Sequence, residues 1–445
     1  MSIERSELED FYTMGLASLE TLEVPEGILA SSKEEIYGCI FGRDSLITTL
    51  KLLRAYHYRH NPYFLTLSRK VLLGIMRLQG SAVNIESGEE PGKSIHEFRI
   101  SGHEHLTRAI TSPWYLYPDG TMRNFDSVDS TPLLLIAIYR YYQKSQDQEF
   151  LHEAMSHVEM ALDWIFHYGD RKNEGLIVYE MPKERRSGGL MVQGWMDSSE
   201  AVFHEDDTPI VFPLAPIEVQ AYAYLALKLW GNFFREPKKR KKYKEKALQI
   251  KQQFNEKFII HSLPRITLAH AVDGNKKPLI SLRSSLGHVL WACRNPIDDK
   301  MTDSIIAKPY RDAIVRSILS PTIFEPEAGI RTLSKHSRAF SANSYHNGSL
   351  WPHDNSLIAE GMENLGYEDQ AAIVREGIFR AYRHFRTPLE LFVYDNGEYK
   401  EYTSLTGQMG CRTQAWSAAT MVSEALALMH YEEKRHEKEF ATHVL

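Results

Sequence analysis

Apolar residues recur every three to four positions along most of this chain, and the strict apolar–polar alternation that marks a half-buried strand is scarce. This spacing predicts a series of helices that bury one face each. Asn61 suits a helix N-cap, and Pro62 suits the first helical position because proline has no amide hydrogen to lose there. We predict helices at 4–22, 44–59, 63–80, 131–144, 148–168, 216–234, 238–258, 285–293, 310–319, 352–365, 369–385 and 413–431.

About a dozen helices, mostly in antiparallel pairs joined by short turns, are the elements of an all-α (α/α)6 toroid. In such a fold the inner helices surround an axial pocket. Long polar and aromatic loops join the pairs, and loops of this length in a compact domain are usually functional or disordered. Because no change of composition marks a linker, we expect one domain over 1–445. The long loops are 81–128, 170–214, 260–284, 320–350 and 386–411.

Composition excludes several classes of protein. A formal net charge of −6 gives no global attraction to nucleic acid, and the basic run after Glu236 fits the solvated start of a helix better than a nucleic-acid or targeting patch. No run approaches the roughly 18 apolar residues of a membrane span. Three cysteines without CxxC spacing form neither a disulfide framework nor a zinc site. With no signal-peptide pattern at the N-terminus, we expect a cytoplasmic protein.

The loops are rich in Tyr and Trp, whose flat apolar faces and polar tips suit sugar rings. Hydrolysis of a glycoside needs one carboxylic acid and a second carboxylate. Asp197 is the candidate acid because Trp195 lies beside it, and a neighbouring indole raises a carboxyl pKa. Capping of the helix predicted to begin at Ser198 is the alternative role for Asp197.

The second carboxylate is expected far away in the sequence. Glu390, Glu398 and Glu401 all lie in the long loop before the last helix, and each taken alone fits a solvated loop residue better than a catalytic one.

Two further clusters are candidate sugar contacts. Arg43 and Asp44 lie at the start of a predicted helix. There they can form charged hydrogen bonds to neighbouring sugar hydroxyls, or form an ion pair with each other. The segment SYHNGSLWPHDN places aromatic and polar side chains before another helix: Tyr345, His346, Trp351, His353 and Asp354. Its two histidines are seven residues apart across a proline and share no helical face, so we expect no metal site. The chain has no P-loop and no nucleophile elbow of the GxSxG type.

In order along the chain, seven motifs resemble those of the helical-barrel glycosidases of the glycogen-debranching (amylo-α-1,6-glucosidase) and family 63 α-glucosidase group. They are FGRDS, EPGKxxHExR, VDxTPL, QGWxDS, APxEVQ, YHNGSxWPHDN and QAW, and they extend from Phe41 to Trp416. The resemblance implies an (α/α)6 barrel, inversion at the anomeric carbon and no cofactor.

The resemblance also implies roles for individual residues. Asp197 matches the general acid, and Glu401, followed by an aromatic residue and a turn ending in TG, is our preferred base. A PELF motif in bacterial debranching-type relatives points instead to Glu390, and Glu398 stays open. Expected substrate contacts are Tyr37, Arg43, Asp44, Trp195, Tyr222, Trp351, His353, Asp354 and Gln414.

The size of the chain resembles that of stand-alone glucosylglycerate and mannosylglycerate hydrolases. We therefore expect an inverting exo-acting α-glycosidase for a small α-glucoside or α-mannoside, with a debranching-type α-1,6-glucosidase as the alternative. Arg99, Arg108, Tyr115 and Tyr222 are candidates for holding an acidic leaving group. A sugar-binding protein on an inactive barrel, or a lyase that uses Tyr and His, is a more distant alternative. The partner is a small carbohydrate, and a homo-oligomer is compatible with the sequence.

Overall fold

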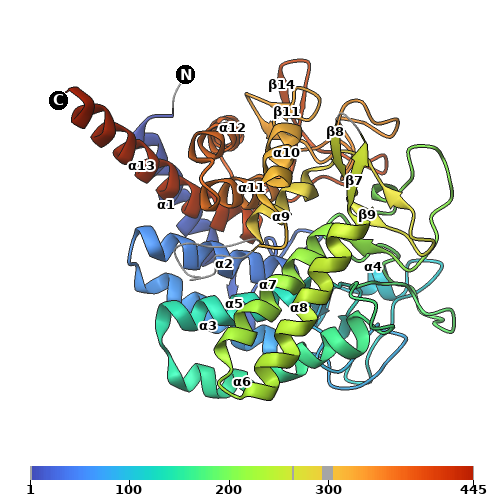
Figure 1. The fold of residues 1–445 in the computed structure, drawn as a ribbon. Helices are drawn as coiled ribbons and strands as arrows, with labels where there is room; N and C mark the ends of the chain where they lie inside the picture. The colour runs from blue at the N-terminus through green and yellow to red at the C-terminus, as the bar shows by residue number, and fades with distance from the viewer. Residues whose placement is uncertain (1–2, 263–264, 293–303, 444–445) are drawn as a thin grey trace.

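The computed structural model describes residues 3–262, 265–292 and 304–443. Helices form the body of the molecule, and the loops that carry α4 (Glu104–Thr107), β7 and β9 gather at one side of it (Figure 1). Within the described ranges no helix is long and apolar enough to cross a membrane.

The inner ring of helices is closed, because each inner helix contacts the next and the last contacts the first. In ring order the inner helices are α2 (Gly42–Tyr58), α5 (Ser130–Ser145), α7 (Ile217–Phe233), the short α9 (His288–Trp291) with the 3-10 turn before it (Ser284–Gly287), α11 (Pro352–Asn364) and α13 (Ala415–His443). The outer helices are α1 (Arg5–Leu22), α3 (Pro62–Arg77), α6 (Gln148–Trp164), α8 (Pro237–Lys257), α10 (Lys308–Ile318) and α12 (Glu368–Phe385).

The amino-acid pattern explains which helix lies in which ring. α7 is apolar on all sides and nearly every residue of it is buried, as a helix surrounded by others requires. α8 buries a single stripe at three- to four-residue spacing, formed by Tyr243, Lys246, Ala247, Ile250 and Phe254, and exposes the rest. The predicted all-α (α/α)6 architecture is confirmed.

Glycines allow the short inner element α9 to approach α11. A Cβ on Gly361 would lie 2.4 Å from the backbone nitrogen of Trp291, and one on Gly287 would lie 2.6 Å from a side-chain carbon of Ile358. Larger residues at either position would push these two inner helices apart.

Most predicted helix boundaries agree with the structure within a few residues, and the Asn61 side chain accepts a hydrogen bond from the amide of Tyr63, as expected of an N-cap. α6 ends at Trp164 and continues as a π-helical turn (Ile165–Gly169). The predicted helix at 285–293 is reduced to a 3-10 turn and one α-helical turn, and Cys293 lies outside the described residues. α13 runs to His443 rather than to 431, because strong helix formers continue it after the apolar repeat ends.

Small antiparallel sheets lie in or beside the long loops and in the segment between α1 and α2. The sequence analysis does not predict them, since strands of two to four residues are too short to show alternation. The three-stranded sheets are β3 (Ile40–Phe41), β4 (Glu97–Arg99) and β5 (Met122–Asn124), and β10 (Pro278–Leu279), β9 (Ala271–Val272) and β6 (Ala215–Pro216). The pairs are β1 (Glu23–Val24) with β2 (Gly27–Ile28), β7 (Ile259–Ser262) with β8 (Arg265–Leu268), β11 (Phe324–Glu325) with β12 (Gly329–Ile330), and β13 (Phe392–Asp395) with β14 (Glu398–Glu401).

A buried network of charges ties four helices together inside the barrel. Lys51 of α2 donates to Glu360 of α11 at 2.8 Å and to Glu424 of α13 at 3.2 Å. Arg375 of α12 donates to the other oxygen of Glu424 at 2.6 Å. Arg54 and Glu363 extend the network by an ion pair of 2.8 Å. Each charge named in this network therefore has a partner on another helix.

Glu424→Gln is expected to destabilise the fold by about 3–5 kcal/mol, because it leaves Lys51 and Arg375 buried without their shared counter-charge. Burial opposes ionisation of Glu424, but these two cations outweigh it and hold its pKa below 4.5. The native carboxylate therefore stabilises the fold above about pH 4.5, and this contribution is lost as the pH falls through the lowered pKa. Urea unfolding of the native protein and the variant at pH 7 and at pH 3 measures both effects, and the difference between the two proteins is expected to be smaller at pH 3.

Glu437→Gln is the matched control, because Glu437 lies on the exposed part of the same helix. Equal free energies of unfolding for the two variants at pH 7 would contradict a structural role for the network.

Candidate active site

A cavity of about 420 Å³ lies where α2, α11 and α13 begin. Arg43 and Asp44 line it from the first turn of α2, Trp351 from the N-cap of α11, and Gln414 and Trp416 from the start of α13. The first amides of a helix have no partner within the helix and carry a partial positive charge. Converging helix starts therefore favour carboxylates and hydroxyl oxygens at this end of the barrel.

Arg43 fixes Asp197 in the cavity wall. Its guanidinium donates to Asp129 at 2.6 Å, to Asp197 at 3.1 Å and to the carbonyl of Gly194 at 2.7 Å. The Asp197 side chain is 23% exposed. Burial raises the pKa of Asp197 to about 6, although Arg43 acts in the opposite direction. A carboxyl that titrates near neutrality is suited to proton transfer.

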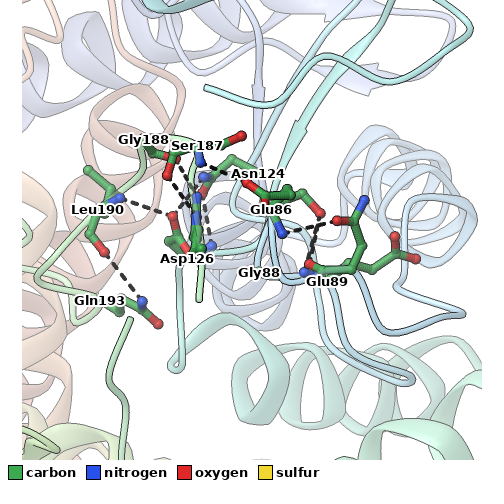
Figure 2. Close-up of polar contacts among 12 residues, drawn as sticks. Glu86, Gly88, Glu89, Asn124, Asp126, Ser187, Gly188, Leu190 and Gln193 are labelled. Carbon is green, nitrogen blue, oxygen red and sulfur yellow. Dashed lines mark hydrogen bonds and ion pairs between the residues drawn. The ribbon is translucent and has the colours of Figure 1, made fainter. Parts of the chain in front are cut away.

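Asp126 anchors the loop that leads to Asp197 (Figure 2). Its buried carboxylate accepts hydrogen bonds from Arg185 at 2.7 Å, from the amide of Leu190 at 3.0 Å and from the side chain of Asn124 at 2.8 Å. Leu190 in turn lines the cavity. Asp126 therefore holds this loop in place and does not itself line the cavity.

Besides Asp197, the cavity lining contains the carboxyl groups of Asp44, Glu97 and Glu390, and of these Glu390 lies in the long loop before the last helix. Tyr345 donates a hydrogen bond to its Oε1, and the amide of Cys411 donates to Oε2 at 2.8 Å. The hydroxyl oxygens of Tyr345 and Tyr37 lie 3.2 Å apart, so the three side chains form one wall. Burial raises the pKa of Glu390 to about 7, with the Tyr345 hydrogen bond opposing the shift.

The structure places Glu401, our preferred second carboxylate, outside the cavity lining. Glu401 lies in β14 and forms an ion pair with Arg412, and its side chain is 34% exposed. Glu398 is exposed at the other end of the same strand. The β13–β14 hairpin, in which Phe392 is paired with Glu401, thus keeps both residues out of the cavity while Glu390 precedes it.

The predicted substrate contacts divide into two layers. Tyr37, Arg43, Asp44, Trp195, Trp351 and Gln414 line the cavity, whereas Tyr222, His353 and Asp354 do not. His353 stacks on Trp416 with 3.6 Å between ring centroids. His288 hydrogen-bonds Asp354 at 2.7 Å and Tyr222 at 2.6 Å. These three predicted contacts therefore support the cavity wall from within the barrel.

Other cavity residues are absent from the predicted set of contacts. His96, Glu97 and Trp416 belong to motifs that the sequence analysis identifies, so a signal existed for them. His346 and Arg99 also line the cavity, and the sequence analysis names them as candidate contacts of the sugar and of the leaving group. The residues nearest the solvent, which carry no such signal, are Ile36, His105, Leu106, Ile110, Trp114 and Gln408. Among the described residues, no group of three or more His, Cys, Asp or Glu side chains is placed to hold a metal ion.

A family model described as amylo-alpha-1,6-glucosidase matches residues 113–423. The chain belongs to this family. It is therefore an α-glycosidase, as its motifs predicted.

Two solved structures of glycosidases share its fold. A family 63 mannosylglycerate hydrolase from Thermus thermophilus, in complex with glucose, superposes with a TM-score of 0.63 at 13% identity, covering 93% of this chain and 99% of that one. A metal-independent α-mannosidase from Streptococcus pneumoniae, in a non-productive complex with α-1,6-mannobiose, gives a TM-score of 0.60 at 15% identity, covering 96% and 93%.

Asp126→Asn is expected to loosen the loop before Asp197, because an amide cannot replace a carboxylate that accepts from Arg185 and from Leu190. Hydrogen–deuterium exchange of residues 185–197 is expected to rise at least about tenfold, since those amides then open more often. Asp119→Asn is the control, because Asp119 lies exposed outside the cavity lining. Unchanged exchange in the Asp126 variant would show that other contacts hold the loop.

Proposed function

We propose that this α-glycosidase hydrolyses a small α-glucoside or α-mannoside by single displacement, with Asp197 as general acid and Glu390 as general base. The observation that carries the proposal is that two carboxyl groups far apart in the sequence line one cavity, each with a raised pKa. Glu390 takes the role for which Glu401 was preferred on sequence grounds.

The hydrogen bonds at Glu390 support its role as the base, and the match of the QGWxDS motif to the family assigns the acid to Asp197. Both oxygens of Glu390 accept hydrogen bonds, which suits an ionised group that takes a proton from water. Asp197 lies beside the indole of Trp195 and donates its proton to the departing glycosidic oxygen. The water attacks the opposite face of the sugar ring, so the configuration at the anomeric carbon inverts. Inversion requires carboxyl groups roughly 6.5–9.5 Å apart.

The size of the cavity supports a small substrate. Its volume of about 420 Å³ lies at the lower end of the range of small-molecule sites, about 300–1,000 Å³. Glucosylglycerate and mannosylglycerate are candidates, because the Thermus thermophilus structure is a mannosylglycerate hydrolase. The family model favours the alternative, an α-1,6-glucosidase that removes terminal glucose from α-glucan oligosaccharides.

Asp197→Asn and Glu390→Gln are each expected to lower kcat about 10²–10⁴-fold on an α-glycoside with a poor leaving group, because each removes one proton transfer. Glu401→Gln is the matched control and is expected to retain activity, since Glu401 lies outside the cavity lining. Proton NMR of the first-formed sugar identifies the anomer. A β-anomer supports inversion, whereas loss of activity in Glu401→Gln with a fully active Glu390→Gln would reverse the assignment.

The pH dependence offers a second test of Glu390. A glycosyl fluoride needs no protonation of its leaving group, so the Asp197→Asn variant is expected to hydrolyse it. In this variant the pH profile of kcat/KM is expected to show a single ionisation, that of Glu390. The value of kcat/KM then rises as Glu390 loses its proton near pH 7. Adding Tyr345→Phe to this variant is expected to move the rise in kcat/KM to higher pH, because the Tyr345 hydrogen bond lowers the pKa of Glu390. If kcat/KM rises at the same pH in both variants, Glu390 is not the base that titrates.

A further inference from the structure

The lining of the cavity changes with depth. Trp351, Trp416 and Asp44 at the helix starts are almost fully buried. At the mouth, Ile36 is 37% exposed and Ile110 is 39% exposed. Leu106, Trp114 and Leu190 are half-buried beside them. An exo-acting glycosidase holds the terminal sugar at the closed end, so the leaving group lies at this apolar mouth.

The mouth is a defined part of the fold. The amide of Trp114 donates to the carbonyl of Leu106 at 3.0 Å, and the amide of Gly188 donates to the carbonyl of Pro113 at 2.9 Å. The second bond joins the mouth to the loop that Asp126 anchors and that continues to Asp197. An indole held in this way offers a flat face to a sugar or polyol.

The arginines in the cavity lining are already paired with acids. Arg43 is bound to Asp129 and Asp197. Arg99 is paired with Glu97 and donates to the carbonyl of Ile36 at 2.6 Å. Two candidates for holding an acidic leaving group, Arg108 and Tyr115, do not line the cavity, and a third, Tyr222, is buried beneath it.

The histidines of the lining add no positive charge at neutral pH. Burial lowers the pKa values of His96 and His346 well below 6.5, and burial with Arg99 nearby lowers that of His105. The lining also contains the carboxyl groups of Asp44, Glu97, Asp197 and Glu390. Among the described residues that line the cavity, each arginine is already paired with an acid. An anionic leaving group would therefore lose its hydration here and meet carboxyl groups without a free cation to balance its charge.

We propose that the leaving group of the substrate is uncharged and packs an apolar face against Ile36, Ile110 and Trp114. This inference rests on the proposed function and narrows its substrate class. It favours glycosides of neutral polyols or of a second sugar over glycosides of hydroxy acids such as glycerate.

Matched substrate pairs test the proposal directly. α-Glucosylglycerol and α-glucosylglycerate differ at the leaving group by a hydroxymethyl in place of a carboxylate, and the α-mannosyl compounds form a second pair. We expect kcat/KM at pH 7 to be at least about tenfold higher for the neutral member of the pair that carries the preferred sugar. Equal or faster hydrolysis of the glycerate would overturn the inference while leaving the proposed hydrolase activity intact. Failure to hydrolyse either pair and the glycosyl fluorides would overturn the proposed function itself.

Substitutions at the mouth of the cavity test whether the leaving group binds there. Ile110→Lys is expected to raise kcat/KM for the glycerate relative to the glycerol compound about tenfold, because it supplies the missing cation. Ile100→Lys is the matched control, since Ile100 is 61% exposed and does not line the cavity. Glu97→Gln is expected to shift the ratio in the same direction by freeing Arg99. Identical ratios in Ile110→Lys and Ile100→Lys, with both variants folded by circular dichroism, would contradict the placement of the leaving group.

Discussion

Closure of the inner ring by α13 against α2 is the contact on which the other features depend. At the start of these helices Gln414 donates to Asp44 at 3.1 Å, in the cavity lining. Further along the same pair, Lys51 reaches Glu424. One helix interface therefore positions a sugar-binding wall at its beginning and a buried ion network along its length. The shape of the cavity and the integrity of the barrel are set by the same packing.

The cavity and the ion network have opposite effects on stability as the pH changes. Burial raises the pKa of Asp44 to about 8, and those of Glu390 and Asp197 to about 7 and 6. The folded state thus holds protons that the unfolded chain releases, and these groups weaken the fold as the pH rises from about 4 towards 8. The network around Glu424 stabilises the fold over that range. The buried carboxyl groups of the cavity therefore lower the stability at neutral pH, and the paired charges of the network act against this loss.

Short stretches of sequence are enough to predict the helices, the fold class and the candidate acid Asp197. Helix caps, apolar spacing and a Trp–x–Asp motif each involve residues close together in the chain. The second carboxylate was harder to predict. What distinguishes Glu390 is its contact with Tyr345 and with the amide of Cys411, both remote in sequence. The turn motif after Glu401 does not reveal that its hairpin leaves the cavity wall. The apolar mouth around Ile36 has no local signal either, since scattered apolar loop residues are ordinary.

The ring also has a consequence for the order in which the protein folds. Helices α2 and α13 are neighbours in space but stand near opposite ends of the sequence, so their contact closes a very long loop of chain. During synthesis α2 emerges early and has no partner on one side until α13 leaves the ribosome. Until then the apolar and charged faces that meet in the finished barrel stay open to other proteins. Such a topology folds slowly and late, and it gives molecular chaperones an extended period in which to act.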